Sequence, residues 1–168
     1  RQKLGLATVV TKNKAYDKGR TGIAERFIQT VRRLANTLLN HLETEIEAKI
    51  PQGHPMIQWA AAHAAWLYNR FHVHGTMKST PFQSLNGRPY KGRIACFGQT
   101  VYGLDPRVSK YRPAWKKGIW LGKDDSDMDV IALDSITIIK VKAVRKTSQQ
   151  WSVDMILAME AGPSDFFG

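Results

Sequence analysis

The sequence predicts an α+β protein, with helices in the first part of the chain and short strands in the second. Two observations lead to this prediction. Apolar residues recur at helical spacing up to about residue 70. After Pro89 the chain changes to short runs rich in β-branched and aromatic residues, separated by glycines. With 43% hydrophobic and 23% charged residues, the composition is that of a globular protein rather than a disordered or fibrous one.

The first elements are a short strand, a loop and a long helix. Leu4–Thr11 predicts the strand, and the polar stretch Lys12–Arg20 predicts the loop. A helix follows from Ile23 to about Ile50, with Thr21 as its N-cap and a break expected within residues 40–47. Its apolar side chains share one face, which we expect to pack against a second helix. They are Phe27, Val31, Leu34, Ala35, Leu38 and Leu42.

Pro55 fits the first position of that second helix, which we expect to run to about Arg70. Its alanines predict close packing against the first helix. Pro81 begins a short helical turn that stops at Gly87.

Four strands are expected after Pro89, the last two joined by a hairpin turn at Asp134-Ser135. Several short strands so close together predict a small barrel. Residues 153–168 read as a linker or tail. The expected strands are Ile94–Gly103, Gly118–Gly122, Met128–Leu133 and Ile136–Val144.

The charge favours a polyanionic partner. Lys and Arg number 25 against 14 Asp and Glu, a formal net charge of +11. The excess lies in two segments. Residues 1–33 hold nine cations and two acids, and residues 91–117 hold seven cations and one acid. Two basic segments predict two contact surfaces, most simply for nucleic acid.

The single cysteine, Cys96, excludes an internal disulfide and a cysteine-only zinc site. No apolar run approaches the roughly 18 residues of a membrane-spanning helix, so we expect no membrane association. These features suggest a reducing compartment, nuclear or cytoplasmic. Because the chain begins with Arg1 and not with Met, we expect it to be a piece of a longer product.

Five strings occur in an order that resembles one protein family. Gly22-Ile23-Ala24-Glu25-Arg26 resembles the G-[IVA]-A-E-R box of retrotransposon integrases, most closely the copia type. The resemblance implies that residues 1–90 are the C-terminal part of a ribonuclease H-like catalytic core. It implies that residues 91–152 form a small SH3-like β-barrel, both within a Pol polyprotein. The other strings are Tyr68-Asn69-Arg70, Thr80-Pro81-Phe82 with Gly87-Arg88-Pro89, Phe97-Gly98 with Val101-Tyr102, and Lys117-Gly118-Ile119-Trp120-Leu121-Gly122.

In this family the glutamate matching Glu25 is the third carboxylate of a metal site, so the resemblance implies a catalytic, metal-binding role for Glu25 and Mg²⁺ or Mn²⁺ as cofactor. Strand transfer at phosphorus uses two divalent ions held by carboxylates. The family takes its other two carboxylates from aspartates well upstream, and Asp17, the only acid before Glu25, is too close to match them. We therefore expect this chain to be inactive alone. Without the resemblance, Glu25 reads as an acid near a helix N-terminus.

Two groups of residues are candidates for DNA contacts, since cations position phosphates and neighbouring aromatics stack on bases. The first comprises Lys12, Lys14, Lys18, Arg20, Arg26, Gln29, Arg32, Arg33 and Asn36. The second comprises Lys110, Arg112, Lys116 and Lys117, interleaved with Tyr111 and Trp115. The sequence leaves open that the first is a solvated helix face, and that in the second Trp115 is core and the cations are loop surface.

We interpret the chain as a fragment of a retrotransposon integrase that binds DNA, both the element ends and the target. The complete integrase is expected to form a homo-oligomer. The alternative is a non-catalytic DNA-binding or protein-interaction module from a decayed or domesticated element.

Overall fold

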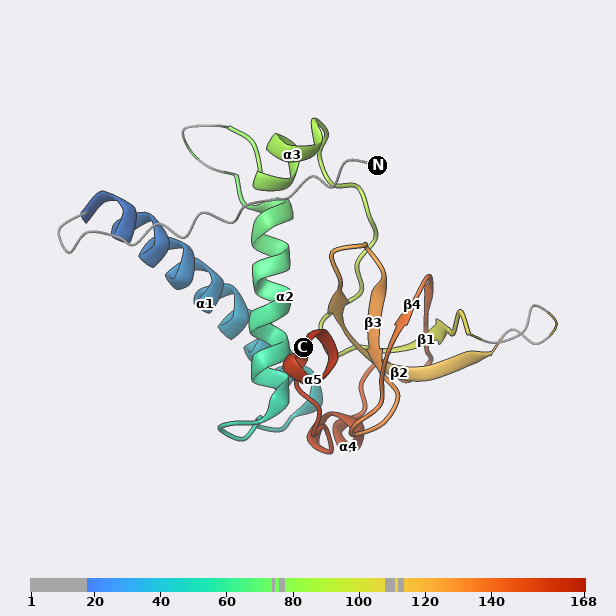
Figure 1. Cartoon of the computed structure of the whole chain (residues 1–168). Coiled ribbons are helices and arrows are strands. Elements are labelled where there is room, and N and C mark those ends of the chain that lie inside the picture. Colours follow the sequence, from blue (N-terminus) through green and yellow to red (C-terminus); the bar gives the residue numbers. More distant parts are fainter. Residues whose placement is uncertain (1–17, 74, 76–77, 108–110, 112–113) are drawn as a thin grey trace.

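A computed structural model describes residues 18–73, 75, 78–107, 111 and 114–168. Helices stand beside one five-stranded antiparallel sheet (Figure 1), so the predicted α+β class is confirmed. The strand expected at Leu4–Thr11, and the loop cations Lys12 and Lys14, lie outside the described residues.

Helix α1 spans Lys18–Ile46 without the expected break. It begins before Thr21, so Thr21 is not its N-cap, and Lys18 and Arg20 lie in the helix and not in a loop. It ends at Ile46 and not at Ile50, since the next residue, Glu47, adopts a left-handed conformation with φ 52°. The expected packing face is confirmed. Ala35 and Leu42 are buried in the main core, Val31, Leu34 and Leu38 pack against it, and the Phe27 ring meets Tyr68 of α2 edge-on at 4.8 Å.

Helices α2 (Pro55–Phe71) and α3 (Pro81–Asn86) agree with the sequence because their ends are capped locally. The His54 side chain accepts a hydrogen bond from the Met56 backbone at the start of α2. The Thr80 hydroxyl accepts one from the Gln83 backbone at the start of α3. Gly87, with φ 67°, ends α3 in the left-handed conformation that glycine adopts without strain.

The sheet has five strands, one more than expected, in the order β4-β3-β2-β1-β5. The stretch expected as one strand, Ile136–Val144, divides into β4 and β5 at residues 142–143. The chain from Ile94 to Gln99 is not strand. The strands are β1 (Thr100–Leu104), β2 (Trp115–Lys123), β3 (Asp129–Ala132), β4 (Ile138–Val141) and β5 (Val144–Lys146).

The sheet is strongly curled but does not close into the expected barrel. Its edge strands β4 and β5 are joined by two residues, which span at most about 11 Å over three Cα steps. In a flat sheet these edges would be about 19 Å apart, at four strand spacings. β4 lies level with residues 119–123 of β2, whereas β5 lies level with residues 116–118, and these two edge strands are not paired with each other. The edges are offset and have no common register.

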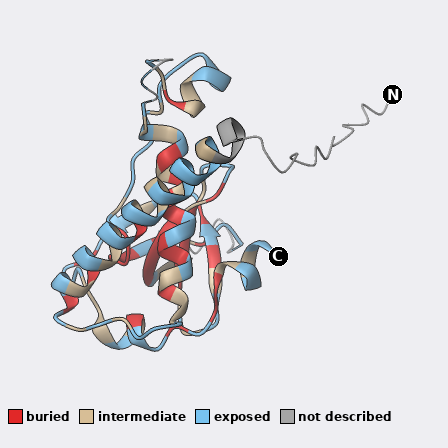
Figure 2. Cartoon of the chain, turned by 90° about the vertical axis from the view of Figure 1, so that its left-hand side faces the viewer, coloured by how far each residue is buried: buried red, intermediate tan, exposed pale blue. Residues whose placement is uncertain are grey.

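One core joins the helices to the sheet. Leu42 of α1, Met56 and Trp59 of α2, and Ile119 and Leu121 of β2 belong to the same buried cluster. Figure 2 shows the buried residues gathered where the helices meet the sheet. A second, smaller cluster fills the inner side of the curl and includes Val101, Trp120, Ile131, Ile139 and Val141.

The end of the chain belongs to the main core and is not the linker expected over residues 153–168. It forms two short helices, α4 (Val153–Leu157) and α5 (Pro163–Phe167). Ile156 is fully buried, and the Trp59 indole Nε1 donates a hydrogen bond to the Ala161 carbonyl at 2.9 Å. The sequence did not indicate this packing because residues 153–168 are few and contact α2, about a hundred positions away.

Candidate nucleic-acid interface

The polar face of α1 is open to solvent over three turns. Its side chains are opposite the face that packs on α2, and Arg26 to Asn36 extend over about 15 Å of helix axis. Cations and amides alternate along this length, so it presents a row of hydrogen-bond donors suited to phosphate oxygens. The exposed members are Glu25, Arg26, Gln29, Arg32, Arg33 and Asn36.

Glu25 lies at the start of this face, and the residues around it do not fit a metal ion. Among the described residues no three His, Cys, Asp or Glu side chains come together in a group. A divalent ion needs several oxygen ligands, and one exposed carboxylate supplies too few. We therefore derive no catalytic step from Glu25.

The second predicted group divides in the structure. Lys110 and Arg112 lie outside the described residues. Lys116 is occupied by an ion pair, since its Nζ lies 2.9 Å from Oδ2 of buried Asp105. This contact, with the Arg107 backbone N–H, holds the pKa of the Asp105 carboxyl below its usual range. Lys117 is exposed, and its Nζ donates to the Gln149 side chain at 3.3 Å.

The sequence reasoning missed two residues that complete a surface with Lys117. Tyr102 is paired directly with Lys117 on β2 and with Arg145 on β5, so the three side chains form one row across three strands. All three are exposed. The Arg145 guanidinium also lies over the Trp115 ring, 4.1 Å from its centroid. We call these four residues the sheet stripe; β5, which carries Arg145, had no signal of its own.

A separate cluster of aromatic side chains surrounds Arg70. Arg70, at the end of α2, lies over the ring of Trp66, 4.0 Å from its centroid. Phe82 and Tyr90 approach the same guanidinium at 5.4 and 5.5 Å. The Tyr90 hydroxyl donates to Asp127 at 2.6 Å, and burial together with this bond raises the pKa of Tyr90. The cluster ties α2, α3 and the following segment together, so its role is structural.

His63 is buried at the centre of the helix–sheet contact. Its ring stacks on Phe97 with centroids 6.0 Å apart and meets Trp120 edge-on at 5.0 Å. Burial lowers the pKa of His63 to about 4, so the ring is neutral near pH 7. Nδ1 has no hydrogen-bond partner, and a Cβ atom on Gly122 would lie 3.0 Å from it. Gly122, with φ 141°, therefore makes room for the imidazole.

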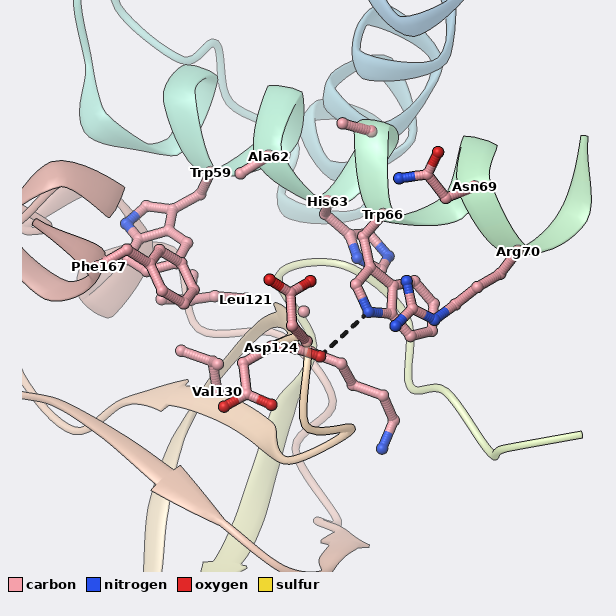
Figure 3. A pocket seen from close by; sticks show the side chains of 14 residues that line it. Trp59, Ala62, His63, Trp66, Asn69, Arg70, Leu121, Asp124, Val130 and Phe167 are labelled. Carbon is pink, nitrogen blue, oxygen red and sulfur yellow. Dashed lines mark hydrogen bonds between the residues drawn. The ribbon is translucent and has the colours of Figure 1, made fainter. Parts of the chain in front are cut away.

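A cavity of about 410 Å³ lies between α2 and the β2–β3 turn, with Phe167 at one side (Figure 3). Two of the residues that line it, Trp66 and Asp124, already have polar partners. The Trp66 Nε1 donates to the Asp124 carbonyl, drawn as the dashed line, and the Asp124 carboxylate pairs with Lys140 at 2.9 Å. Since no nucleophile with an adjacent base faces this cavity among the described residues, we assign no chemistry to it.

No family model, curated protein or solved structure matches this chain. None of the helices in the described part of the chain is both long and apolar enough to cross a bilayer.

Proposed function

We propose that this chain is a DNA-binding fragment of a retrotransposon integrase of the copia type. The polar face of α1 is the observation that carries the proposal. Arg26, Arg32 and Arg33 stand exposed on it beside Gln29 and Asn36, whereas the opposite face is committed to the core. A long helix with one cationic, amide-rich side can follow a phosphate backbone over several contacts.

The finer fold assignment is part of the proposal. The two helices would be the last portion of a ribonuclease H-like core, and the curled sheet would be an SH3-like domain. The family-like strings support this assignment, because their residues take part in the packing. Arg70 stacks on Trp66 and lies near Phe82, Phe97 stacks on His63, and Gly122 leaves room for the His63 ring.

The alternative, a non-catalytic binding module from a decayed or domesticated element, is favoured by the position of Glu25. Its carboxylate is exposed, and among the described residues it takes part in no group of ligands. The two readings differ over Mg²⁺ or Mn²⁺ chemistry, over assembly into a homo-oligomer, and over whether element ends and target DNA are both bound.

Duplex binding by the chain tests what the two readings share. The affinity of a fluorescent duplex should fall steeply between about 50 and 200 mM salt, with a log–log slope near −0.9 for each phosphate neutralised. Arg32→Gln and Arg33→Gln should each make the slope shallower by about one. Lys49→Gln, just beyond the other end of α1, removes the same charge from an exposed side chain and should change little. A flat salt response would exclude both readings.

Glu25→Gln separates the two readings when it is tested in an enzyme reconstituted with the two missing aspartates. In an integrase it should abolish metal-dependent strand transfer and leave duplex binding nearly unchanged. In a binding module no strand transfer is present to lose, and removing a negative charge from the α1 face should leave binding equal or slightly tighter.

A further inference from the structure

We infer that the sheet stripe (Lys117, Tyr102, Arg145 and Trp115) is a second nucleic-acid site, specific for the unpaired bases of single-stranded DNA. This inference rests on the proposed DNA binding and adds to it a distinct surface and a distinct form of the ligand.

The stripe is the uncovered continuation of a face that is otherwise buried. Outward-pointing residues on β2 alternate as Trp115, Lys117, Ile119 and Leu121. The helices cover Ile119 and Leu121 completely, whereas Lys117 is exposed and Trp115 is half-buried. Figure 1 shows this end of β1 and β2 extending away from α1 and α2. A surface formed by three strands is thus left open to solvent.

Tyr102 lies at the centre of this surface with a cation on either side. Directly opposed side chains on neighbouring strands have Cβ atoms about 5 Å apart, so Lys117 and Arg145 both lie within reach of a phosphate bound beside the Tyr102 ring. Tyr102 is 41% exposed. An exposed aromatic ring of this kind offers a face on which a base can stack.

The arrangement favours single strands over duplex for a steric reason. Bases in a duplex are stacked on each other and present only their edges in the grooves, so a ring on a sheet cannot reach their faces. Unpaired bases expose theirs. The guanidinium of Arg145 on Trp115 adds a second planar group beside Tyr102, which suits a following base.

The local charge completes the match. Residues 100–107, 115–119 and 144–150 hold five cations, Arg107, Lys116, Lys117, Arg145 and Lys146, and one acid, Asp105. Asp105 is buried and already neutralised by Lys116 and Arg107. Of the five cations, Lys117 and Arg145 share the face of Tyr102, so the phosphates of a bound strand meet positive charge there.

The test compares an oligothymidylate of about ten nucleotides, within the roughly 4–16 nucleotides that one small β domain covers, with a duplex of equal length. Tyr102→Val keeps strand propensity and removes the ring. It should weaken single-strand binding by roughly 5- to 150-fold, the range for base-stacking aromatics, and leave duplex binding unchanged. Tyr102→Phe should bind as the wild type. Phe71→Val is the matched control, because it removes a ring of similar exposure, 48%, from the end of α2.

The outcomes separate the inference from the proposed function. Duplex binding with single-strand affinity unaffected by Tyr102→Val would overturn the inference alone. No binding to either DNA would overturn the proposed function as well. An RNA of the same length bound more tightly than DNA, with the same dependence on Tyr102, would overturn the assignment to DNA. A photoreactive oligonucleotide should cross-link the wild-type chain within β1, and cross-linking confined to α1 would also contradict the stripe.

Discussion

Gly98 lies against the side chain of Leu42: a Cβ atom on Gly98 would be 2.5 Å from Leu42 Cδ1. The contact joins the segment before β1 to the C-terminal end of α1. Leu42 is fully buried, and Gly98 has φ 80°, which other residues rarely adopt. The close approach explains why a glycine follows Phe97 at this position.

Gly98→Ala should therefore destabilise the fold more than the same change elsewhere. Gly53 has a nearly identical φ of 82° but open space around it, so Gly53→Ala isolates the backbone strain. We expect Gly98→Ala to lower the free energy of unfolding by about 1–3 kcal/mol more than Gly53→Ala, the usual cost of overpacking. Urea denaturation measures both, and equal losses would show that Leu42 gives way.

Arg70→Ala should lower the free energy of unfolding by about 1–2 kcal/mol, as expected for a half-buried cation held among aromatic rings. Arg70→Lys should recover only part of this, because an ammonium lacks the planar face that stacks on Trp66. Arg88→Ala is the control, since Arg88 is exposed just after the end of α3. Urea midpoints that rank the two alanine variants equally would contradict a structural role for Arg70.

His63 should make the protein lose stability in mild acid. Its pKa is 6.5 when unfolded and about 4 in the buried site, so the unfolded state binds the proton first as the pH falls. Stability is therefore fully present above about pH 6.5 and is lost towards pH 4, by about 3 kcal/mol over that range.

His63→Leu should remove this part of the pH dependence, and His41→Gln, at an exposed histidine, should not. Urea denaturation at about pH 7 and at several points down to about pH 4.5 measures the difference between variants. The comparison between variants cancels the contributions of Asp105 and Asp124, because these carboxyls are present in every variant. Their pKa values are also lowered, so they affect stability at lower pH. Parallel curves for wild type and His63→Leu would refute the assignment.

Ile156→Ala should destabilise the whole fold and not only the end of the chain. Ile156 is fully buried in the core that joins α2 to the sheet, and losing its side chain should cost about 2–5 kcal/mol. Leu157→Ala, the next residue and 40% exposed, should cost much less. Tryptophan fluorescence during denaturation follows all five tryptophans, including Trp59, which bonds to the Ala161 carbonyl. A separate early transition in Ile156→Ala would mean that residues 153–168 unfold on their own.

The sequence by itself determined the elements whose ends depend on near neighbours. Pro55 starts α2, Thr80 caps α3 and Gly87 ends it, because each acts on backbone groups within a few residues. The packing face of α1 also followed from its spacing. The start of α1 did not, since a helix extends as far as its hydrogen bonds continue and Thr21 is too weak a signal to begin it there.

Only the tertiary structure decided what lies side by side. Tyr102 and Arg145 are 43 positions apart and become neighbours because β5 returns to β1. The ion pair that occupies Lys116, the strand order of the sheet and the burial of Ile156 in the main core arise in the same way. Strand register and core contacts depend on the free energy of the whole packed chain, and a local pattern of residues carries no record of which distant segment completes it.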